Sequence, residues 1–160
     1  MFKKMIKRIL FGQRVEDMYY SAIKAKIRGG LFKYWSMYIS KKIVRNYGCY
    51  LAVNASVGNG LKLRHPIGIV IGEGVNISDD VTIYQNVTLG ASKVGEGKKG
   101  IYPSIGCGTV IYAGSVIVGG VSIGEYATIG ANSVVLTDVE DNSVVAGVPA
   151  KVIGQIKKQP

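Results

Sequence analysis

An aliphatic residue returns at every sixth position through much of this 160-residue chain, and that period constrains the fold more than any other feature. The repeated positions fall in two blocks, which are Ile71, Ile77, Ile83 and Leu89, followed by Ile105, Ile111, Ile117, Ile123, Ile129 and Val135. Four residues after each position of the second block stands a small or β-branched residue. A period of six fits neither an amphipathic helix nor the alternation of hairpin strands. It predicts short strands that each end in a tight corner.

Three such strands would complete one triangular turn of a parallel β-helix, with the aliphatic residues pointing inward. Every strand would pair with the turn above and the turn below, so that the stack buries one continuous apolar column. We therefore expect an all-β solenoid, a parallel β-helix of hexapeptide repeats, preceded by a short N-terminal α-helical segment. The expected boundaries are a basic helical segment at 1–48, the β-helix at 49–155 and a tail at 156–160.

Two interruptions break the six-residue period. The step from Leu63 to Ile71 is eight residues, which predicts an outward bulge around Pro66, beside the only histidine of the chain, His65. A glycine- and lysine-rich stretch at 90–104 separates the two blocks and is too polar for the apolar column. Insertions in a solenoid form surface loops, often on its binding face. These two interruptions therefore mark a candidate site.

The excess positive charge is confined to the N-terminal segment. Residues 1–50 hold 12 Lys and Arg against two acids, so their net charge of 12 − 2 = +10 equals that of the whole chain. Apolar residues at helical spacing within 2–10 predict a basic amphipathic helix, and a second helical stretch runs over 35–43 after a break at 28–30. These helices are expected to cap the open end of the solenoid, to attach to an anionic membrane surface, or to do both.

The sequence disfavours several classes of protein. Nucleic-acid binding is disfavoured because the positive charge does not extend to the β-helix. The N-terminus lacks the features of a secretory signal, and no apolar run approaches the ~20 residues that span a bilayer. Cys49 and Cys107 match no metal or redox spacing, which is typical of free thiols in a reducing compartment. We expect a cytoplasmic protein, with possible peripheral contact at the inner face of the membrane through its basic helix.

Three segments resemble the serine acetyltransferase group of hexapeptide acyltransferases. They are "LRHPIGIVIGEGVNISDDVTIYQNVTLG" at 63–90, "IGCGTVIYAGSVIVGGVSIGEYATIGANSVVL" at 105–136 and "AGVPAKVIG" at 146–154, and the resemblance covers about 50–155. The resemblance implies a left-handed β-helix, assembly as a homotrimer, and binding of acetyl-CoA in clefts between subunits, with no metal. Transfer of an acetyl group to a hydroxyl is implied as well.

Acetyl transfer to a hydroxyl needs a base. A hydroxyl is a weak nucleophile at neutral pH, and a neutral imidazole, with a pKa of about 6.5, can take its proton as it attacks a thioester. Backbone N–H groups at a glycine-rich turn could stabilise the oxyanion that forms. His65 matches the histidine that serves as this base in the family, and Glu73 matches a glutamate that follows it and helps to orient the site.

The resemblance also implies residues that bind the coenzyme. Small residues would let the pantetheine arm of the coenzyme lie against the backbone, and a lysine would neutralise part of the negative charge of its phosphates. The residues that match these roles are Gly90, Ala91, Ala113, Gly114, Gly130, Ala131 and Lys151. Lys93, Lys98 and Lys99 in the polar stretch are weaker candidates, because each is also explained by solubility.

The sequence departs from the family where serine would be recognised. A carboxylate is expected before the base, but this chain has Arg64, which would repel the ammonium group of serine. An Arg-His pair is expected before Pro103, but Ile101 and Tyr102 stand there, and no aspartate lies within 50–54 to orient the base. These changes favour a sugar hydroxyl of a capsule or lipopolysaccharide as the acceptor, with Arg64 and Tyr102 as its contacts. The alternative for Tyr102, slightly favoured over contact with the acceptor, is a ring packed on the coil.

Three alternatives are considered. The chain could be a serine O-acetyltransferase of cysteine biosynthesis, or a non-catalytic β-helical scaffold for binding. A β-helical carbonic anhydrase needs several histidines to hold zinc, and this chain has one.

Overall fold

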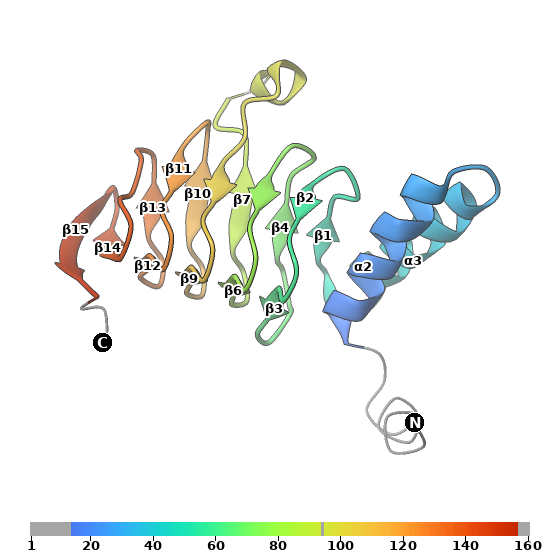
Figure 1. Cartoon of the computed structure of the whole chain (residues 1–160), viewed down its shortest axis with the longest axis horizontal. Coiled ribbons are helices and arrows are strands. Elements are labelled where there is room, and N and C mark those ends of the chain that lie inside the picture. The colour runs from blue at the N-terminus through green and yellow to red at the C-terminus, as the bar shows by residue number, and fades with distance from the viewer. Residues whose placement is uncertain (1–13, 94, 157–160) are drawn as a thin grey trace.

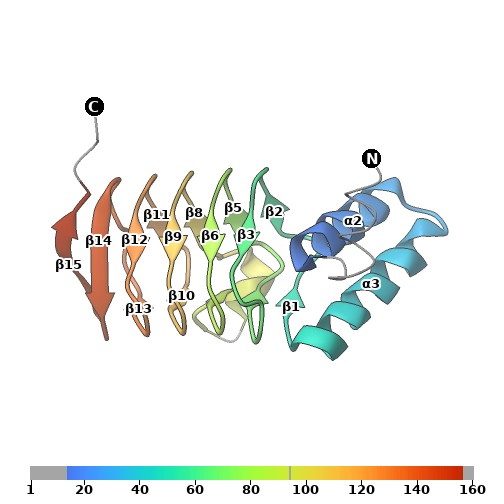
Figure 2. The ribbon, with the colours of Figure 1, turned by 90° about the horizontal axis from the view of Figure 1, so that it is seen from below.

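The structure, a computed structural model, describes residues 14–93 and 95–156. Two helices, α2 (Val15–Arg28) and α3 (Phe32–Tyr47), precede a stack of short strands (Figures 1 and 2). The helix expected within 2–10 lies outside the described residues. None of the helices in the described ranges is long and apolar enough to cross a membrane.

Helix α2 buries one apolar side. Val15, Met18, Tyr19 and Ala22 recur at steps of three and four residues along it, and all are buried. Acidic residues in its first turn and basic residues in its last turn complement the helix dipole. The break at 28–30 is expected from the sequence, whereas the helix before it is not, even though its apolar spacing is regular.

The strands form three sheets, and the chain passes from one sheet to the next as it coils. The first face contains β1 (Tyr50–Leu51), β4 (Val70–Ile71), β7 (Thr88–Gly90), β10 (Val116–Val118) and β13 (Val134–Val135). The second face contains β2 (Ser56–Val57), β5 (Asn76–Ile77), β8 (Ser104–Ile105) and β11 (Ser122–Ile123). The third face contains β3 (Lys62–Leu63), β6 (Thr82–Ile83), β9 (Val110–Ile111), β12 (Thr128–Ile129), β14 (Ser143–Gly147) and β15 (Ala150–Gln155). The pairs are parallel except that β15 returns antiparallel along β14.

The aliphatic residues of the six-residue repeat form the inner column, as the sequence predicts. In the register of the first face, Leu89 lies beside Ile71 on one coil and Ile117 on another. All the repeated positions named above are at most 2% exposed. Burial of each such side chain contributes about 1.5–3 kcal/mol, so the stack gains stability coil by coil.

The small residues at the corners are buried as well. The Thr109 hydroxyl donates to the carbonyl of Gly124 at 2.8 Å, and the Ser115 hydroxyl donates to the carbonyl of Gly130 at 2.8 Å. Each hydroxyl thereby satisfies a backbone oxygen of the next coil, which explains how polar side chains lie inside an otherwise apolar stack.

Two corners matter for function. The turns that join the third face to the first, at 64–69, 84–87, 112–115 and 130–133, are called the His65 corner. The turns that join the first face to the second, including 72–75 and the excursion at 91–103, are called the loop corner. The excursion carries a 3₁₀ helix, η1 (Glu96–Lys99), and projects from the stack (Figure 1).

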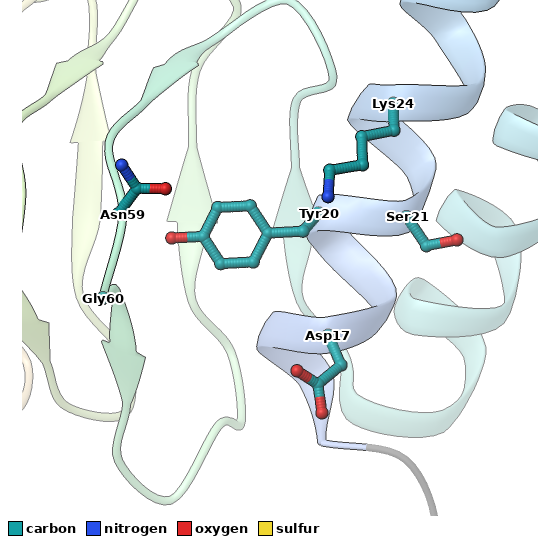
Figure 3. A pocket seen from close by; sticks show the side chains of 6 residues that line it. All are labelled: Asp17, Tyr20, Ser21, Lys24, Asn59 and Gly60. Carbon is teal, nitrogen blue, oxygen red and sulfur yellow. The ribbon is translucent and has the colours of Figure 1, made fainter.

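The helical pair covers the N-terminal end of the β-helix. The Tyr19 hydroxyl donates to the carbonyl of Ala52 at 2.7 Å, and the carboxylate of the buried Glu16 accepts a hydrogen bond from the N–H of Leu63 at 2.9 Å. Next to these contacts, Tyr20 reaches across a hollow of about 490 Å³ between α2 and the β2–β3 turn, and its hydroxyl donates to the carbonyl of Gly58 at 2.5 Å (Figure 3). The helices therefore cap the solenoid.

Candidate active site

His65 lies in an exposed bulge between β3 and β4. Its φ of 50° is in the left-handed region, which few residues other than glycine adopt. The neighbouring Ile67 is 64% exposed, and Gly68 also has a positive φ, of 66°. The eight-residue step seen in the sequence thus forms the predicted outward bulge. The imidazole is presented to solvent instead of pointing into the apolar column.

Two tyrosines continue the line of rings that starts at His65. The ring centroids of His65 and Tyr84 are 6.5 Å apart, and Tyr84 stacks on Tyr112 at 5.1 Å with an interplanar angle of 23°. The register of the third face places Arg64, Tyr84 and Tyr112 in one row on successive coils. Neither tyrosine is expected from the sequence as part of the site, although each directly follows an aliphatic residue of the repeat.

Four of the residues expected to bind the coenzyme share the His65 corner, on later coils. They are Ala113, Gly114, Gly130 and Ala131. Packing alone explains both glycines. A Cβ at Gly114, whose φ is 73°, would collide with the side chain of Asn132, and a Cβ at Gly130 would lie 2.8 Å from the Cβ of Ala146. Their part in coenzyme binding stays a prediction.

Gly90 differs from these glycines. It ends β7 at the loop corner, and a Cβ placed there would have no heavy atom within 4 Å. Packing within the chain therefore does not require glycine at this position, and the surface in front of its backbone is open to a ligand. Ala91 follows at the start of the excursion, whereas Lys151 lies exposed on β15, opposite Ala146 of β14.

Glu73 also lies at the loop corner, one strand away from His65. Its carboxylate accepts hydrogen bonds from the Tyr50 hydroxyl at 3.0 Å and from the Asn54 side-chain amide. The hydrogen bond to Glu73 raises the pKa of Tyr50, because it stabilises the protonated phenol. Glu73 thus contacts the first coil, and the structure does not bring it to the imidazole of its own chain.

Tyr102 packs at this same corner. Its ring lies over the backbone of Gly72, where a Cβ would approach a ring carbon to 2.8 Å, and over Gly74, where a Cβ would also collide with it. Near Gly97 of η1, a Cβ would lie 2.7 Å from the Tyr102 hydroxyl. The Tyr102 ring therefore packs between the excursion and the coil, which is the alternative role given for this residue above. Its contact with an acceptor stays a prediction.

A hollow of about 450 Å³ adjoins the bulge. Arg64 and Pro66, which flank His65 in sequence, line it together with Arg14, Lys62 and the buried Glu16. Arg14 forms an ion pair with Asp17 at 3.4 Å, and Lys62 lies 3.8 Å from Asp80. Of the three lining cations, Arg64 is the one without a carboxylate within ion-pair distance among the described residues, so it is the group that an anionic ligand would meet beside the candidate base.

Comparison with known proteins supports the hexapeptide-repeat fold. Residues 102–137 match the family described as bacterial transferase hexapeptide (six repeats). Serine acetyltransferase of Buchnera aphidicola subsp. Acyrthosiphon pisum is 41% identical over 127 residues, which are 78% of this chain and 45% of that protein. The crystal structure of Neisseria gonorrhoeae serine acetyltransferase superposes with a TM-score of 0.82 at 32% identity, covering 91% of this chain and 56% of the other.

The chain is a serine acetyltransferase-like hexapeptide-repeat protein. A further structure of this group, serine acetyltransferase of Brucella abortus strain S19 in complex with coenzyme A, has a TM-score of 0.78 at 33% identity and covers 88% of this chain and 55% of that chain. The β-helix is left-handed, as in these relatives. This serine acetyltransferase-like chain spans about half the length of the relatives that it matches.

Proposed function

We propose that the chain is an acetyl-CoA-dependent O-acetyltransferase in which His65 is the general base. The observation that carries the proposal is the exposed left-handed bulge, which presents the only imidazole of the chain beside a hollow of about 450 Å³. Five other non-glycine residues of the described chain also have a positive φ, so what distinguishes His65 is its place in the outward bulge that breaks the six-residue period. The similarity to serine acetyltransferases supports the same chemistry.

The reaction would proceed by direct transfer. His65 takes the proton of the acceptor hydroxyl while its oxygen attacks the thioester carbonyl, and the oxyanion that forms is stabilised by backbone N–H groups. When the carbon–sulfur bond breaks, the thiolate of coenzyme A leaves, and the imidazolium returns the proton to it. The products are the acetyl ester and free coenzyme A, and the base is regenerated.

Acetyl-CoA would lie along the His65 corner and would also contact a loop corner. Ala113 and Ala131 leave little side chain along that corner, and the open backbone at Gly90 offers a further surface at the loop corner. Within one chain, strand β4 separates the two corners. A homotrimer would place the loop corner of one subunit against the His65 corner of the next, and we propose this assembly. The coenzyme A complex of the Brucella abortus relative supports a coenzyme site on this fold.

The comparisons favour serine as the acceptor, and they give no support to polysaccharide biosynthesis, which the departures at Arg64 and Tyr102 favour. A specific observation keeps the second acceptor class under consideration. Arg64 occupies the position expected for a carboxylate and lines the hollow without a carboxylate partner among the described residues, which suits an acidic sugar better than the ammonium group of serine.

An acceptor screen separates these possibilities. Release of the coenzyme A thiol from acetyl-CoA would be followed with serine, neutral sugars and uronic acids as acceptors. Acetyl transfer to any of these acceptors supports the proposed O-acetyltransferase activity. The acceptor with the highest kcat/KM identifies the class of the substrate. If coenzyme A binds but no acceptor from the panel is acetylated, the non-catalytic scaffold becomes the better interpretation.

A further inference from the structure

The end of the helical pair exposes a group of apolar side chains. We call this group the helical tip, and its members are Ile27, Leu31, Phe32, Tyr34, Trp35, Met37 and Tyr38, all between 42% and 84% exposed. Both ribbon views place the turn between α2 and α3 at the end of the helical pair that points away from the β-helix (Figures 1 and 2). The helical tip is therefore the part of the described chain that projects beyond the cap.

The exposure is unusual for a helix that packs against its neighbours. In α3 only Ser36, Ile39 and Ile43 are buried, so Trp35 and Tyr38 face solvent. Tyr34, Trp35 and Tyr38 recur at steps of three and four residues, so they share one side of α3. A group of exposed apolar side chains of this kind marks a site of interaction with a protein or a membrane. The side chains are also ordered among themselves, because Trp35 and Tyr38 stack with ring centroids 5.4 Å apart.

The charge around the helical tip has one sign. The sequence between Asp17 and Glu73 contains no aspartate or glutamate, and the cations within 24–45 are Lys24, Lys26, Arg28, Lys33, Lys41, Lys42 and Arg45. The guanidinium of Arg28 lies 4.2 Å from the ring centroid of Phe32, so cation and aromatic surface are in direct contact. A partner for this surface must offer both negative charge and an apolar phase.

We propose that the helical tip binds the surface of an anionic lipid bilayer. Tryptophan and tyrosine rings occupy the headgroup region, where one side is apolar and the other is wet, and nearby cations pair with anionic lipids. A nucleic acid or another polyanion would take the cations but leave Leu31 and Phe32 in water. A second copy of the tip would bring cations against cations, at a Coulomb cost. This surface is distinct from the segment at 2–10, and the proposal does not depend on acetyl transfer.

The chain contains a built-in reporter, because Trp35 is its only tryptophan. Full-length protein would be mixed with vesicles of phosphatidylcholine alone or of phosphatidylcholine with phosphatidylglycerol, and tryptophan emission recorded. The proposal expects a blue shift with anionic vesicles only, reversed in about 1 M salt, where the Debye length falls to about 3 Å. An unchanged spectrum would overturn it. So would protection of Trp35 from acrylamide before vesicles are added, because a second copy would then already cover the tip.

Cosedimentation with the anionic vesicles locates the binding surface. Leu31→Ser together with Phe32→Ser should weaken binding about tenfold or more, since each removes the transfer free energy of an apolar side chain. The matched control is Val152→Ser with Ile153→Ser, an equally exposed apolar pair on β15 at the other end of the molecule, which should bind as the unaltered chain does. Circular dichroism would show that both variants are folded.

A third variant separates the helical tip from the N-terminal residues. Lys3→Ser with Lys4→Ser should reduce binding by no more than about fivefold per charge, the amount expected from long-range attraction alone, and should leave the Trp35 blue shift in place. If this variant abolishes the blue shift while the tip variant binds normally, the N-terminal residues are the contact and the proposal is wrong.

Discussion

The imidazole of His65 and the phenol of Tyr84 lie 6.5 Å apart, ring centroid to ring centroid, on consecutive coils of the β-helix. Tyr84 is in turn stacked on Tyr112 at 5.1 Å, so the histidine stands at one end of a row of rings. The row runs along the outer surface beside the His65 corner. Two features thus position the candidate base. One is the regular stacking of coils, which aligns the rings, and the other is the local bulge that carries His65.

Replacement of the base tests the mechanism. His65→Asn should reduce kcat/KM for acetyl transfer by roughly 10²–10⁴-fold, the usual contribution of a general base. Asparagine tolerates the left-handed conformation that this position requires, so the thermal midpoint should stay within a degree or two of the unaltered protein. Steady-state kinetics and calorimetry provide the two readouts. Activity retained by a folded His65→Asn chain would remove His65 from the proposed mechanism.

The open backbone at Gly90 makes a second prediction. Gly90→Ala adds a methyl group where no heavy atom lies within 4 Å, so stability should not change. If the coenzyme lies against this backbone, the KM for acetyl-CoA should rise roughly tenfold or more, because a shift of about 1 Å in the bound donor is costly. Gly154→Ala is the matched control, since its position is equally open and lies on β15. An unaltered KM in the Gly90 variant would argue against contact at this edge.

The glycine at the other corner should behave in the opposite way. A Cβ at Gly130 would lie 2.8 Å from that of Ala146, so Gly130→Ala should lower the free energy of unfolding by about 1–3 kcal/mol. Urea unfolding measures this loss. A variant of full stability would show that the two coils can separate without cost.

The charge beside the base should govern acceptor choice. Arg64→Asp introduces the carboxylate that the family carries before its base, and it should raise kcat/KM for serine while lowering it for a uronic acid. One surface-exposed charge typically contributes about 1 kcal/mol or less, so changes of about fivefold are expected in each direction. Competition between the two acceptors measures the ratio directly, and Arg45→Asp on α3 is a control of equal charge change. A ratio that moves equally in both variants would mean that only net charge matters.

The buried tyrosine of α2 should make stability depend on alkaline pH. Burial raises the pKa of Tyr19 well above its usual value of about 10. Because the folded pKa is the higher one, the stabilisation is complete below about pH 10 and is lost as pH rises above it, by up to ~1.4 kcal/mol per pH unit. Tyr50 contributes in the same direction, since Glu73 raises its pKa too.

Tyr19→Phe tests this dependence. The variant should lose about 0.5–1.5 kcal/mol at neutral pH, because the Ala52 carbonyl loses one of its two donors and keeps the N–H of Ala55 at 3.2 Å. Its stability should nevertheless fall less steeply above pH 10. Urea unfolding between pH 8 and 11 measures both effects, with the exposed Tyr34→Phe as control. Identical slopes for Tyr19→Phe and the unaltered chain would contradict the assignment.

The fold was predictable because one number, the six-residue period, fixes which side chains are buried. Ile71 and Ile117 show this, since each is fully buried at the position that the period demands. The bulge at His65 was predictable from a departure from the same period. Helix α3 was only partly predictable, because Trp35 and Tyr38 share helical spacing with Ile39 and Ile43 but face solvent, since no element within 14–93 or 95–156 covers them.

The candidate site was less accessible to sequence reasoning. Glu73 follows His65 by only eight residues, yet one strand of the solenoid carries the chain from one corner to the next in that distance. The position of Tyr102 depends on how the excursion folds back onto Gly72 and Gly74, and no periodic pattern encodes that path. Arg64, by contrast, was visible in the sequence, and the structure adds the hollow that it lines.

The register of the strands also limits how such a chain can change in length over evolution. Ile71 pairs with Leu89, and Ile117 pairs with Val135, so one circuit advances the chain by 89 − 71 = 135 − 117 = 18 positions. Loss of a single hexapeptide would rotate every later residue onto the wrong side of the triangle, even though each inward residue would stay inward. The bulge at His65 shows a second permitted departure, since Leu63 pairs with Ile83 and that circuit takes 83 − 63 = 20 positions. Viable descendants should therefore gain or lose whole circuits of eighteen, or else place their insertions at corners where the chain can leave the stack, as it does at the bulge and at the excursion.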